Sequence, residues 1–534
     1  MKSKINFNLV IFLITVLYSC VNTNAYLKST NPNVSWLKNS QNDIKVKLLP
    51  EKYKYCDDKY LYCYNNVKNR AKNPIPTFFK IDKNSFDIVK SSNDVYKDKL
   101  YNVIELLWNE KAGWILDADF SDKKHVVYSA VPISFDGKGN RKKLFNLDIE
   151  NKEKQVNGDF MINNDSTKVT YYSSIYFGKE NKLTFIAKCF DFVSMNLLWE
   201  HEYEFPYEVK SKSEAGNIEI IVNNNGEPQF IVKSYFDKRK EVRKVDGVKE
   251  ANYIYKFFIL NQEGKVDEYD IDTKGYFVKS IEFPYSKSLN PIICAYTFQN
   301  KNFKELQGII FKMVNTQTKK VVDLKEIKLN TKKLTAYNPN TKKEINQPDR
   351  YERVENLKII DVITTDDRSV YVLGEIKYKI TICTKSKYGE RCNSYFVGGN
   401  ILVTKIGKDG NESWSKIIPK EQYVNSEQIL GRYYEGIPHS FKAFPIGNNV
   451  HLFFNDHEKN YKESSLTKIK TWNGIKTSFI HLIIKPDGVY EVIETMNKKD
   501  HPLLVDINSI QKIDESTIFF RDWSTLGKLK IDLE

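Results

Sequence analysis

The sequence predicts an all-β chain folded as a β-propeller of about seven or eight four-stranded blades. Tyr and Phe are abundant, with 33 and 31 residues, and short segments rich in Ile, Val, Tyr and Phe alternate with turn residues. This composition and punctuation are typical of strands. A hairpin pattern also recurs along the chain, and no single hairpin can bury both of its faces, whereas a ring of stacked copies can. Stacked β-sandwiches are the alternative fold.

The recurring pattern is an apolar strand, a polar turn, and a second strand that often carries an aromatic or apolar residue just after the turn. Its copies lie at 188–205, 257–272, 311–327, 403–418 and 481–495, with a sixth candidate at 78–91. Gly264, Gly410 and Gly488 lie in three of the turns, where glycine allows the positive φ that a tight hairpin requires. The copies are spaced more widely than single hairpins, so each is expected to mark one blade.

Two segments fit this pattern less well. In residues 96–109 the apolar positions suit a helix and a buried strand equally, and the pattern does not decide between them. The polar segment 329–357 contains two prolines and is expected to be an insertion.

Residues 1–19 are expected to form a lipoprotein signal peptide, because two lysines precede an apolar run that is too short to span a bilayer. Leu17-Tyr18-Ser19-Cys20 resembles a bacterial lipobox, which implies that Cys20 is acylated. Cleavage after Ala25 is the alternative, and it would remove Cys20. Residues 20–75 are then expected to be a tether and N-terminal extension, and residues 76–534 the propeller.

The formal net charge is +14 and hydrophobic residues make up 41% of the chain, as in a packed globular protein. The excess of Lys and Arg fits either a Lys-rich proteome or attraction to anionic lipid headgroups, acidic glycans or nucleic acid. The basic residues are scattered, and the densest segment, 238–250, also contains acids, which indicates a solvated loop. We therefore expect no nucleic-acid partner.

Six cysteines remain when Cys20 is set aside, and two pairs of them are close in sequence. Cys56 and Cys63 form one pair and Cys383 and Cys392 the other, so each pair is a disulfide candidate in an oxidising compartment. Their spacing is wider than that of zinc knuckles and no nearby histidine completes a set, so no metal is assigned. The remaining cysteines, 189 and 294, lie in apolar runs and are expected to be buried thiols, with a long-range bridge as the alternative.

The chain lacks the sequence motifs of serine nucleophile elbows, zinc hydrolases and phosphate-binding loops, so no catalytic residue and no cofactor is assigned. Asn455, Asp456 and His457 form the best candidate ligand cluster, because they group oxygen and nitrogen donors at an expected strand end. The alternative is a turn in which Asn and Asp cap the backbone.

The sequence GNILVTKIGKDGNESWSKIIPKEQ at 399–422, followed by NNVHLFFNDHEKN at 448–460, resembles uncharacterised secreted or lipid-anchored propeller-like proteins of Gram-negative bacteria. The matching residues are Trp414, Lys416, Ile418, Pro419, Lys420, Gln422, Phe454, Asn455, Asp456 and Asn460. This resemblance implies a fold and a compartment but no activity. The hairpin pattern is also similar to the outer hairpins of quinoprotein and WD40 blades, which implies that Trp199 and Trp414 pack between sheets.

The sequence therefore predicts a non-enzymatic lipoprotein of the cell envelope, on the periplasmic or extracellular face. We expect the protein to contact the membrane through its N-terminal lipid and to present its loops to a protein or glycan partner. An extracytoplasmic hydrolase or lyase, acting on glycans or peptides at one mouth of the propeller, is the alternative. An ordinary secreted protein cut after Ala25 is a further one.

Overall fold

The computed structural model of the protein describes residues 33–36, 52–66, 76–91, 103–122, 125–133, 140–148, 154–163, 165–177, 180, 182–207, 220–236, 240–283, 291–329, 335–338, 343–346, 354–387, 389–408, 413–425, 440–460, 469–474, 476–497, 504–521 and 526–531. Within these ranges, strands dominate and no helix is long and apolar enough to cross a membrane. Cys20 and the expected signal peptide lie outside the described residues.

Seven four-stranded sheets and one seven-stranded sheet follow one another around a ring, and we number them in that order. Sheet 1 contains β2 (Lys52–Cys56), β3 (Tyr60–Asn66), β4 (Pro76–Asp82) and β5 (Ile88–Ser91). Sheet 2 contains β6 (Val103–Trp108), β7 (Gly113–Asp119), β8 (His125–Pro132) and β9 (Lys142–Asp148). Sheet 3 contains β10 (Lys154–Ile162), β11 (Lys168–Phe177), β12 (Lys182–Asp191) and β13 (Leu197–Glu204). Sheet 4 contains β14 (Ile220–Val222), β15 (Pro228–Tyr235), β18 (Tyr253–Leu260) and β19 (Val266–Ile271).

The second half of the ring repeats the same antiparallel order. Sheet 5 contains β20 (Phe277–Glu282), β21 (Ile292–Phe298), β22 (Leu306–Asn315) and β23 (Lys320–Lys328). Sheet 6 is built on β26 (Leu357–Thr364), β27 (Val370–Ser386), β28 (Gly389–Ile406) and β29 (Ser413–Ile418). Sheet 7 contains β31 (Lys442–Ile446), β32 (Asn449–His457), β33 (Thr477–Ile484) and β34 (Tyr490–Asn497). Sheet 8 contains β35 (Asp506–Asp514), β36 (Thr517–Arg521), β37 (Leu526–Lys530) and β1 (Val34–Trp36).

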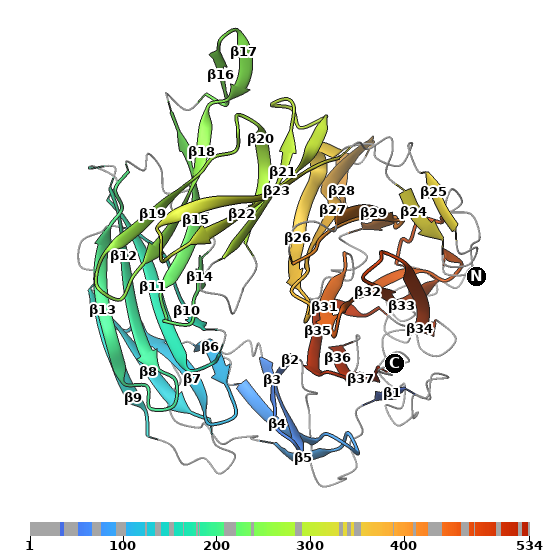
Figure 1. The fold of residues 1–534 in the computed structure, drawn as a ribbon. Helices are drawn as coiled ribbons and strands as arrows, with labels where there is room; N and C mark the ends of the chain where they lie inside the picture. Colours follow the sequence, from blue (N-terminus) through green and yellow to red (C-terminus); the bar gives the residue numbers. More distant parts are fainter. Residues whose placement is uncertain are drawn as a thin grey trace.

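The sheets pack side by side around the whole ring (Figure 1). Their first strands lie toward its middle, where β2 contacts β6 and β35, and β26 contacts β20 and β31. A buried hydrophobic cluster fills every junction between neighbouring sheets, including the junction between sheets 8 and 1. The prediction of a propeller with seven or eight four-stranded blades is confirmed, with eight blades, and the sandwich alternative is wrong.

Sheet 8 joins the two ends of the described chain. Val34 pairs with Leu529 in an antiparallel ladder, so β1 is the outermost strand of a sheet whose other three strands come from the C-terminal end. The first three strands, β1, β2 and β3, all precede residue 76 and belong to the propeller. The boundary expected at residue 76 is therefore too late. Local sequence did not reveal β1 because it is short and its pairing partner lies at the other end of the chain.

The recurring hairpins are the third and fourth strands of successive sheets. The six copies correspond to β4–β5, β12–β13, β18–β19, β22–β23, β28–β29 and β33–β34, in sheets 1 and 3 to 7. Gly264 and Gly488 adopt φ of 81° and 80° in their turns, as the sequence predicted, while Gly410 lies outside the described residues. The segment 96–109 forms a strand where it is described, as β6.

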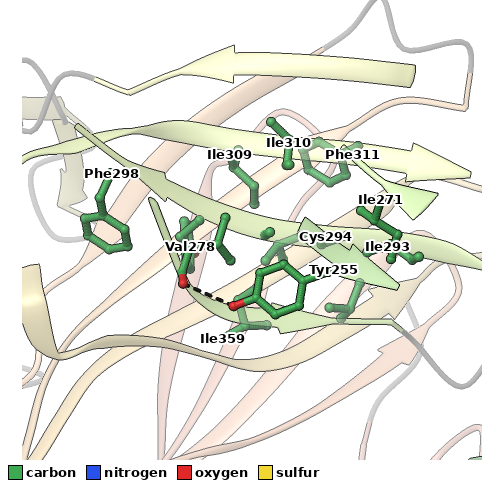
Figure 2. Close-up of a cluster of buried hydrophobic side chains, with 14 of the residues drawn as sticks. Tyr255, Ile271, Val278, Ile293, Cys294, Phe298, Ile309, Ile310, Phe311 and Ile359 are labelled. Atoms are coloured by element: carbon green, nitrogen blue, oxygen red, sulfur yellow. Dashed lines mark hydrogen bonds between the residues drawn. The ribbon is translucent and has the colours of Figure 1, made fainter. Parts of the chain in front are cut away.

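The largest buried cluster spans sheets 4, 5 and 6 (Figure 2). Tyr255 from sheet 4 contributes its ring to this cluster and donates a 3.2 Å hydrogen bond from its hydroxyl to the carbonyl oxygen of Val278 in sheet 5. Burial and the neighbouring Tyr253 raise the pKa of Tyr255, so the hydroxyl remains a donor. One side chain thus supplies both apolar packing and a hydrogen bond across a junction.

Sheet 6 carries the additions to the basic blade. Within the expected insertion 329–357, β24 (Thr335–Asn338) and β25 (Lys343–Asn346) form a hairpin, and β24 extends the sheet beside β29. The 3-10 turn η3 (Val354–Asn356) leads into β26. β27 and β28 are longer than the strands of the other sheets and form a long hairpin. β30 (Gln422–Asn425) pairs with β28 within this hairpin.

Candidate functional site

A groove of about 680 Å³ lies between sheets 7 and 8. It falls in the size range of small-ligand and peptide pockets. Its lining combines aliphatic side chains with polar and charged groups: Asn33, Asp366, Ile446, Gly447, Asn448, Asn449, His451, His481, Ile483, Lys485, Glu491, Ile493, Thr495, Glu515, Leu529, Lys530 and Ile531. Asn33 directly precedes β1, so the residue that leads into the strand completing sheet 8 also lines the groove.

Two buried histidines line this groove. His451 on β32 and His481 on β33 are diagonal neighbours, because the register pairs His481 with Phe453 and His451 with Ile483. Nδ1 of His451 lies 2.8 Å from Nε2 of His481, a distance that requires one ring to donate and the other to accept. The His481 ring also stacks on Phe453 with the centroids 4.6 Å apart.

Both histidines are neutral at physiological pH. Burial, together with the charge of Lys512, lowers the pKa of His451 to about 4. Burial and the neighbouring His451 lower the pKa of His481 to about 3. The pair is therefore a neutral, hydrogen-bonding surface rather than a proton donor near pH 7.

Two lysines at the groove are paired with carboxylates. Lys485 Nζ lies 2.6 Å from a carboxylate oxygen of Glu491, and Lys512 Nζ lies 2.8 Å from one of Glu515. Lys512 also donates to the Pro445 carbonyl oxygen. These pairs place charges of both signs beside the aliphatic lining.

The structure separates the side chains of Asn455, Asp456 and His457. The side-chain amide of Asn455 donates a 2.8 Å hydrogen bond to the Val505 carbonyl oxygen at the start of sheet 8. Asp456, the next residue on β32, accepts 2.8 Å hydrogen bonds from Asn460 Nδ2 and from the His457 backbone. Nδ1 of His457 accepts from the Lys459 backbone at 3.2 Å. The three side chains cap separate backbone groups and do not point to one ligand.

Asp456 is the most perturbed acid of this segment. Its burial raises its pKa to about 7, against the lowering effect of the His457 and Asn460 hydrogen bonds. Asn460 in turn bonds both backbone groups of Lys470, with 2.8 Å hydrogen bonds in each direction. Asp456 therefore acts through Asn460 to hold the two ends of the β32–β33 connection together.

A buried ion pair, not expected from the sequence, lies between sheets 6 and 7. Lys420 Nζ donates to Glu375 Oε1 and, at 2.9 Å, to Gln422 Oε1, and the Lys420 and Glu375 side chains are 0% exposed. Ser440 donates its hydroxyl to the other oxygen of Glu375 and its backbone N–H to Gln422. Gln422 then donates a 2.7 Å hydrogen bond to the Asn455 carbonyl oxygen. This network fixes β30 against sheet 7.

The network explains part of the sequence pattern at 399–460. Lys420, Gln422 and Asn455 are members of it, while Ile418 and Phe454 lie in the hydrophobic cluster between sheets 6 and 7. Trp414 is half-buried against the same cluster, and its Nε1–H donates 3.0 Å to the Pro486 carbonyl oxygen in the outer turn of sheet 7. These residues of the pattern are therefore explained by the packing of sheet 6 against sheet 7.

The other tryptophan expected between sheets has a similar place. Trp199 is half-buried against the cluster between sheets 3 and 4. Two positions further along β13, His201 Nε2 lies 2.9 Å from the Gln262 carbonyl oxygen in the outer turn of sheet 4. A Cβ on Gly264 in that turn would make a tight contact, 3.0 Å, with the His201 ring, and the φ of 81° favours glycine there.

The cysteine pairs differ in how far the structure describes them. Cys383 and Cys392, paired across β27 and β28, are joined in a disulfide. Cys63 is buried on β3 and pairs in register with Tyr53, whereas Cys56 pairs with Leu61, so a Cys56–Cys63 bridge stays a prediction. Cys189 and Cys294 are buried thiols on different sheets, and burial raises the pKa of each.

One group of potential metal ligands occurs among the residues with described side chains, namely Cys383, Glu390 and Cys392. Both of its sulfur atoms are in the disulfide, so they are not thiolate ligands in this state.

No protein-family model and no curated protein matches the chain. Among solved structures, the β-propeller domain of the Trilobed protease from Pyrococcus furiosus is 12% identical, with 85% of this chain and 98% of that chain covered and a TM-score of 0.30. The Dos1 propeller is 7% identical over 77% of this chain and 90% of that chain, with a TM-score of 0.30. A quinohemoprotein alcohol dehydrogenase from Pseudomonas putida HK5 is 10% identical over 76% and 71%, with a TM-score of 0.28. These similarities are remote, and the assignment of the fold depends on the eight sheets themselves.

Proposed function

We propose that the protein is a non-enzymatic, lipid-anchored scaffold of the cell envelope that binds a segment of a protein partner in the groove between sheets 7 and 8. The observation that carries the binding role is the groove itself, with its aliphatic lining and its neutral histidine pair. The lipobox-like residues before Cys20 and the resemblance to Gram-negative envelope proteins support the location.

A protein partner fits this lining better than a glycan. The groove offers branched aliphatic side chains, among them Ile483, Ile493 and Leu529, and no Trp, Tyr or Phe of the described residues lines it. Aliphatic pockets suit apolar peptide side chains, whereas sugar rings are usually bound on flat aromatic faces. The ion pairs at the rim and the histidine pair then supply polar contacts that orient the bound segment.

The groove is tested by a variant that blocks it. Ile493 is 40% exposed in the groove, and Val89, on an outer strand of sheet 1, is also 40% exposed but outside it. Ile493→Lys should reduce partner capture from envelope extracts about tenfold or more, because it places an unpaired charge in the aliphatic lining. Val89→Lys is the matched control and should leave capture unchanged.

A photo-crosslinking residue at position 493 identifies what the groove holds. Crosslinking to a defined protein at 493 and not at 89 supports the proposal. Crosslinking to a glycan would show that the partner is a glycan and not a protein. Equal capture by both lysine variants would refute the groove as the binding surface. Intact mass of the mature protein tests the anchor separately, because acylated Cys20 and a chain that starts at Tyr26 differ in mass.

A further inference from the structure

A small hairpin projects from sheet 4, away from the ring (Figure 1). Its strands, β16 (Val242–Val245) and β17 (Val248–Ala251), form a separate two-stranded sheet inserted between β15 and β18. The turn is Asp246-Gly247, with φ of 48° and 83°, which is the two-residue hairpin turn that matches strand twist. The sequence indicated a solvated loop here, and the structure gives that loop a defined shape.

The base of this hairpin is anchored, whereas its end is exposed. Arg243 bonds Glu250 across the strands at 2.7 Å and lies over the Phe236 ring at 4.0 Å. Asn252 Nδ2 donates 2.9 Å to the Lys240 carbonyl oxygen and so closes the base. These contacts give the projecting end a fixed direction relative to sheet 4.

The residues at the end of the hairpin are exposed to solvent. Val245 and Val248 face each other in register and are 40% and 65% exposed, so part of their apolar surface stays in contact with water. Lys244 and Lys249 are also directly opposite each other and exposed. Like charges at directly opposite positions destabilise a pair of strands. An anion that binds between the two lysines would relieve this repulsion.

We propose that residues 244–249, the hairpin tip, contact an anionic lipid surface. Glu241 is paired with Lys233, and Glu250 is paired with Arg243. The tip itself contains two lysines and one acid, Asp246, so its net charge is positive. Lysines attract acidic headgroups, and adjacent exposed valines enter the boundary between headgroups and acyl chains. An acidic glycan or a nucleic acid would use the lysines but not the valines. The contact does not depend on acylation of Cys20 or on the groove.

Vesicle sedimentation tests the proposal. The chain from Tyr26 onward contains every described strand and lacks both the apolar N-terminal run and Cys20. It should partition onto vesicles of phosphatidylglycerol and phosphatidylethanolamine about tenfold more strongly than onto phosphatidylcholine vesicles. The double variant Lys244→Glu/Lys249→Glu should lose that preference, and Val245→Ser/Val248→Ser should weaken binding to both kinds of vesicle severalfold.

The matched control changes the same charge elsewhere. Lys301 and Lys304 are exposed in the β21–β22 connection of sheet 5, and Lys301→Glu/Lys304→Glu should bind vesicles like the unchanged chain. Equal losses in both lysine variants would assign binding to the overall charge of +14 and overturn the proposal. Unchanged binding of the serine variant, or binding to heparin or DNA but not to vesicles, would also overturn it. Circular dichroism verifies that each variant is folded, and Ile493→Lys should bind vesicles normally.

Discussion

Two pairs of buried side chains are hydrogen-bonded to each other, one lining the groove and one between sheets 6 and 7. His451 and His481 share one hydrogen bond and are neutral, whereas Lys420 and Glu375 are charged and satisfied by Gln422 and Ser440. A buried group left without its partner incurs the cost of its removal from water. The two pairs therefore respond differently to pH and to substitution.

The histidine pair makes stability depend on pH. The pKa of each histidine is lowered on folding, so the unfolded chain binds more protons below about pH 6.5. The contribution of the pair to the free energy of unfolding should be constant well above this pH and should fall by about 2 kcal/mol per histidine at pH 5, whereas Asp456, with its pKa raised to about 7, contributes in the opposite direction. Urea denaturation at pH 7.5 and pH 5 measures the loss.

The control for this prediction is a histidine on the surface. His481→Phe should remove part of the acid sensitivity, because the new ring can still stack on Phe453 but carries no proton. His125, which is exposed beside Asp122, should not share the effect, so His125→Gln should keep the acid sensitivity of the native chain. The same pH profile in all three proteins would contradict the assignment.

The buried ion pair should show strong coupling between its partners. Lys420→Met leaves the Glu375 carboxylate buried without its cation and should lower the free energy of unfolding by about 3–5 kcal/mol. The double variant Lys420→Met/Glu375→Leu should recover most of this loss, as denaturant titration would measure. Lys265→Met removes an exposed lysine 3.1 Å from Glu263 and should change stability by less than about 1 kcal/mol. Additive losses in the double variant would exclude coupling.

At the scale of elements, sheet 6 carries the additional strands, and they lie in the connections between strands rather than on the faces that pack against neighbouring sheets. β27 and β28 continue beyond the region where they pack on neighbouring sheets, and their outer part is exposed. The stacked rings of Tyr395 and Tyr423, with centroids 4.6 Å apart, join this hairpin to β30. The hairpin end is therefore a local unit whose stability differs from that of the ring.

Removal of the disulfide at this hairpin should lower the free energy of every state in which the hairpin is open. Cys383→Ser/Cys392→Ser should therefore decrease the free energy of hairpin opening and the free energy of global unfolding by about the same amount, about 2–3 kcal/mol in the chain-entropy model. Hydrogen exchange of the backbone amides near the disulfide would measure local opening, and urea denaturation would measure global unfolding. Unchanged stability by both measurements would contradict the prediction.

At the scale of the whole molecule, the ring is closed by a strand of three residues. β1 pairs with β37, and Val34 is buried in the cluster between sheets 7 and 8. The junction between sheets 8 and 1 is also filled by apolar side chains, among them Phe79 and Phe519. The N-terminal segment therefore contributes to the stability of the last sheet despite its short length.

A charge in this strand should weaken the closure. Val34→Asp puts a carboxylate into the cluster between sheets 7 and 8 and should lower the free energy of unfolding by about 3 kcal/mol or more. Ser35, the next residue, is only partly buried, and Ser35→Asp should cost less than about 1 kcal/mol. Thermal denaturation of the two variants makes the comparison. Equal stability would show that β1 does not close the ring.

The outer hairpins were predictable because their signals are local. The turn at Asn261 and Gly264 uses a side-chain cap and a positive φ that are both encoded within five residues. By contrast, His451 and His481 are 30 residues apart, and no local signal relates them. Glu375 and Lys420 were likewise not predicted as a pair, since 45 residues separate them and a charged residue in a sequence does not show whether it is buried.

By itself, the sequence determined that the chain is built of strands, where its outer hairpins turn, and that repeated copies must stack. Strand propensity, turn chemistry and hydrophobic alternation act over a few residues, so they are visible without a structure. The tertiary structure decided the number of sheets, the use of β1 to complete sheet 8, and the groove with its histidine pair. These features depend on pairing between distant segments, and the free energy of that pairing comes from contacts that exist only once the ring has formed.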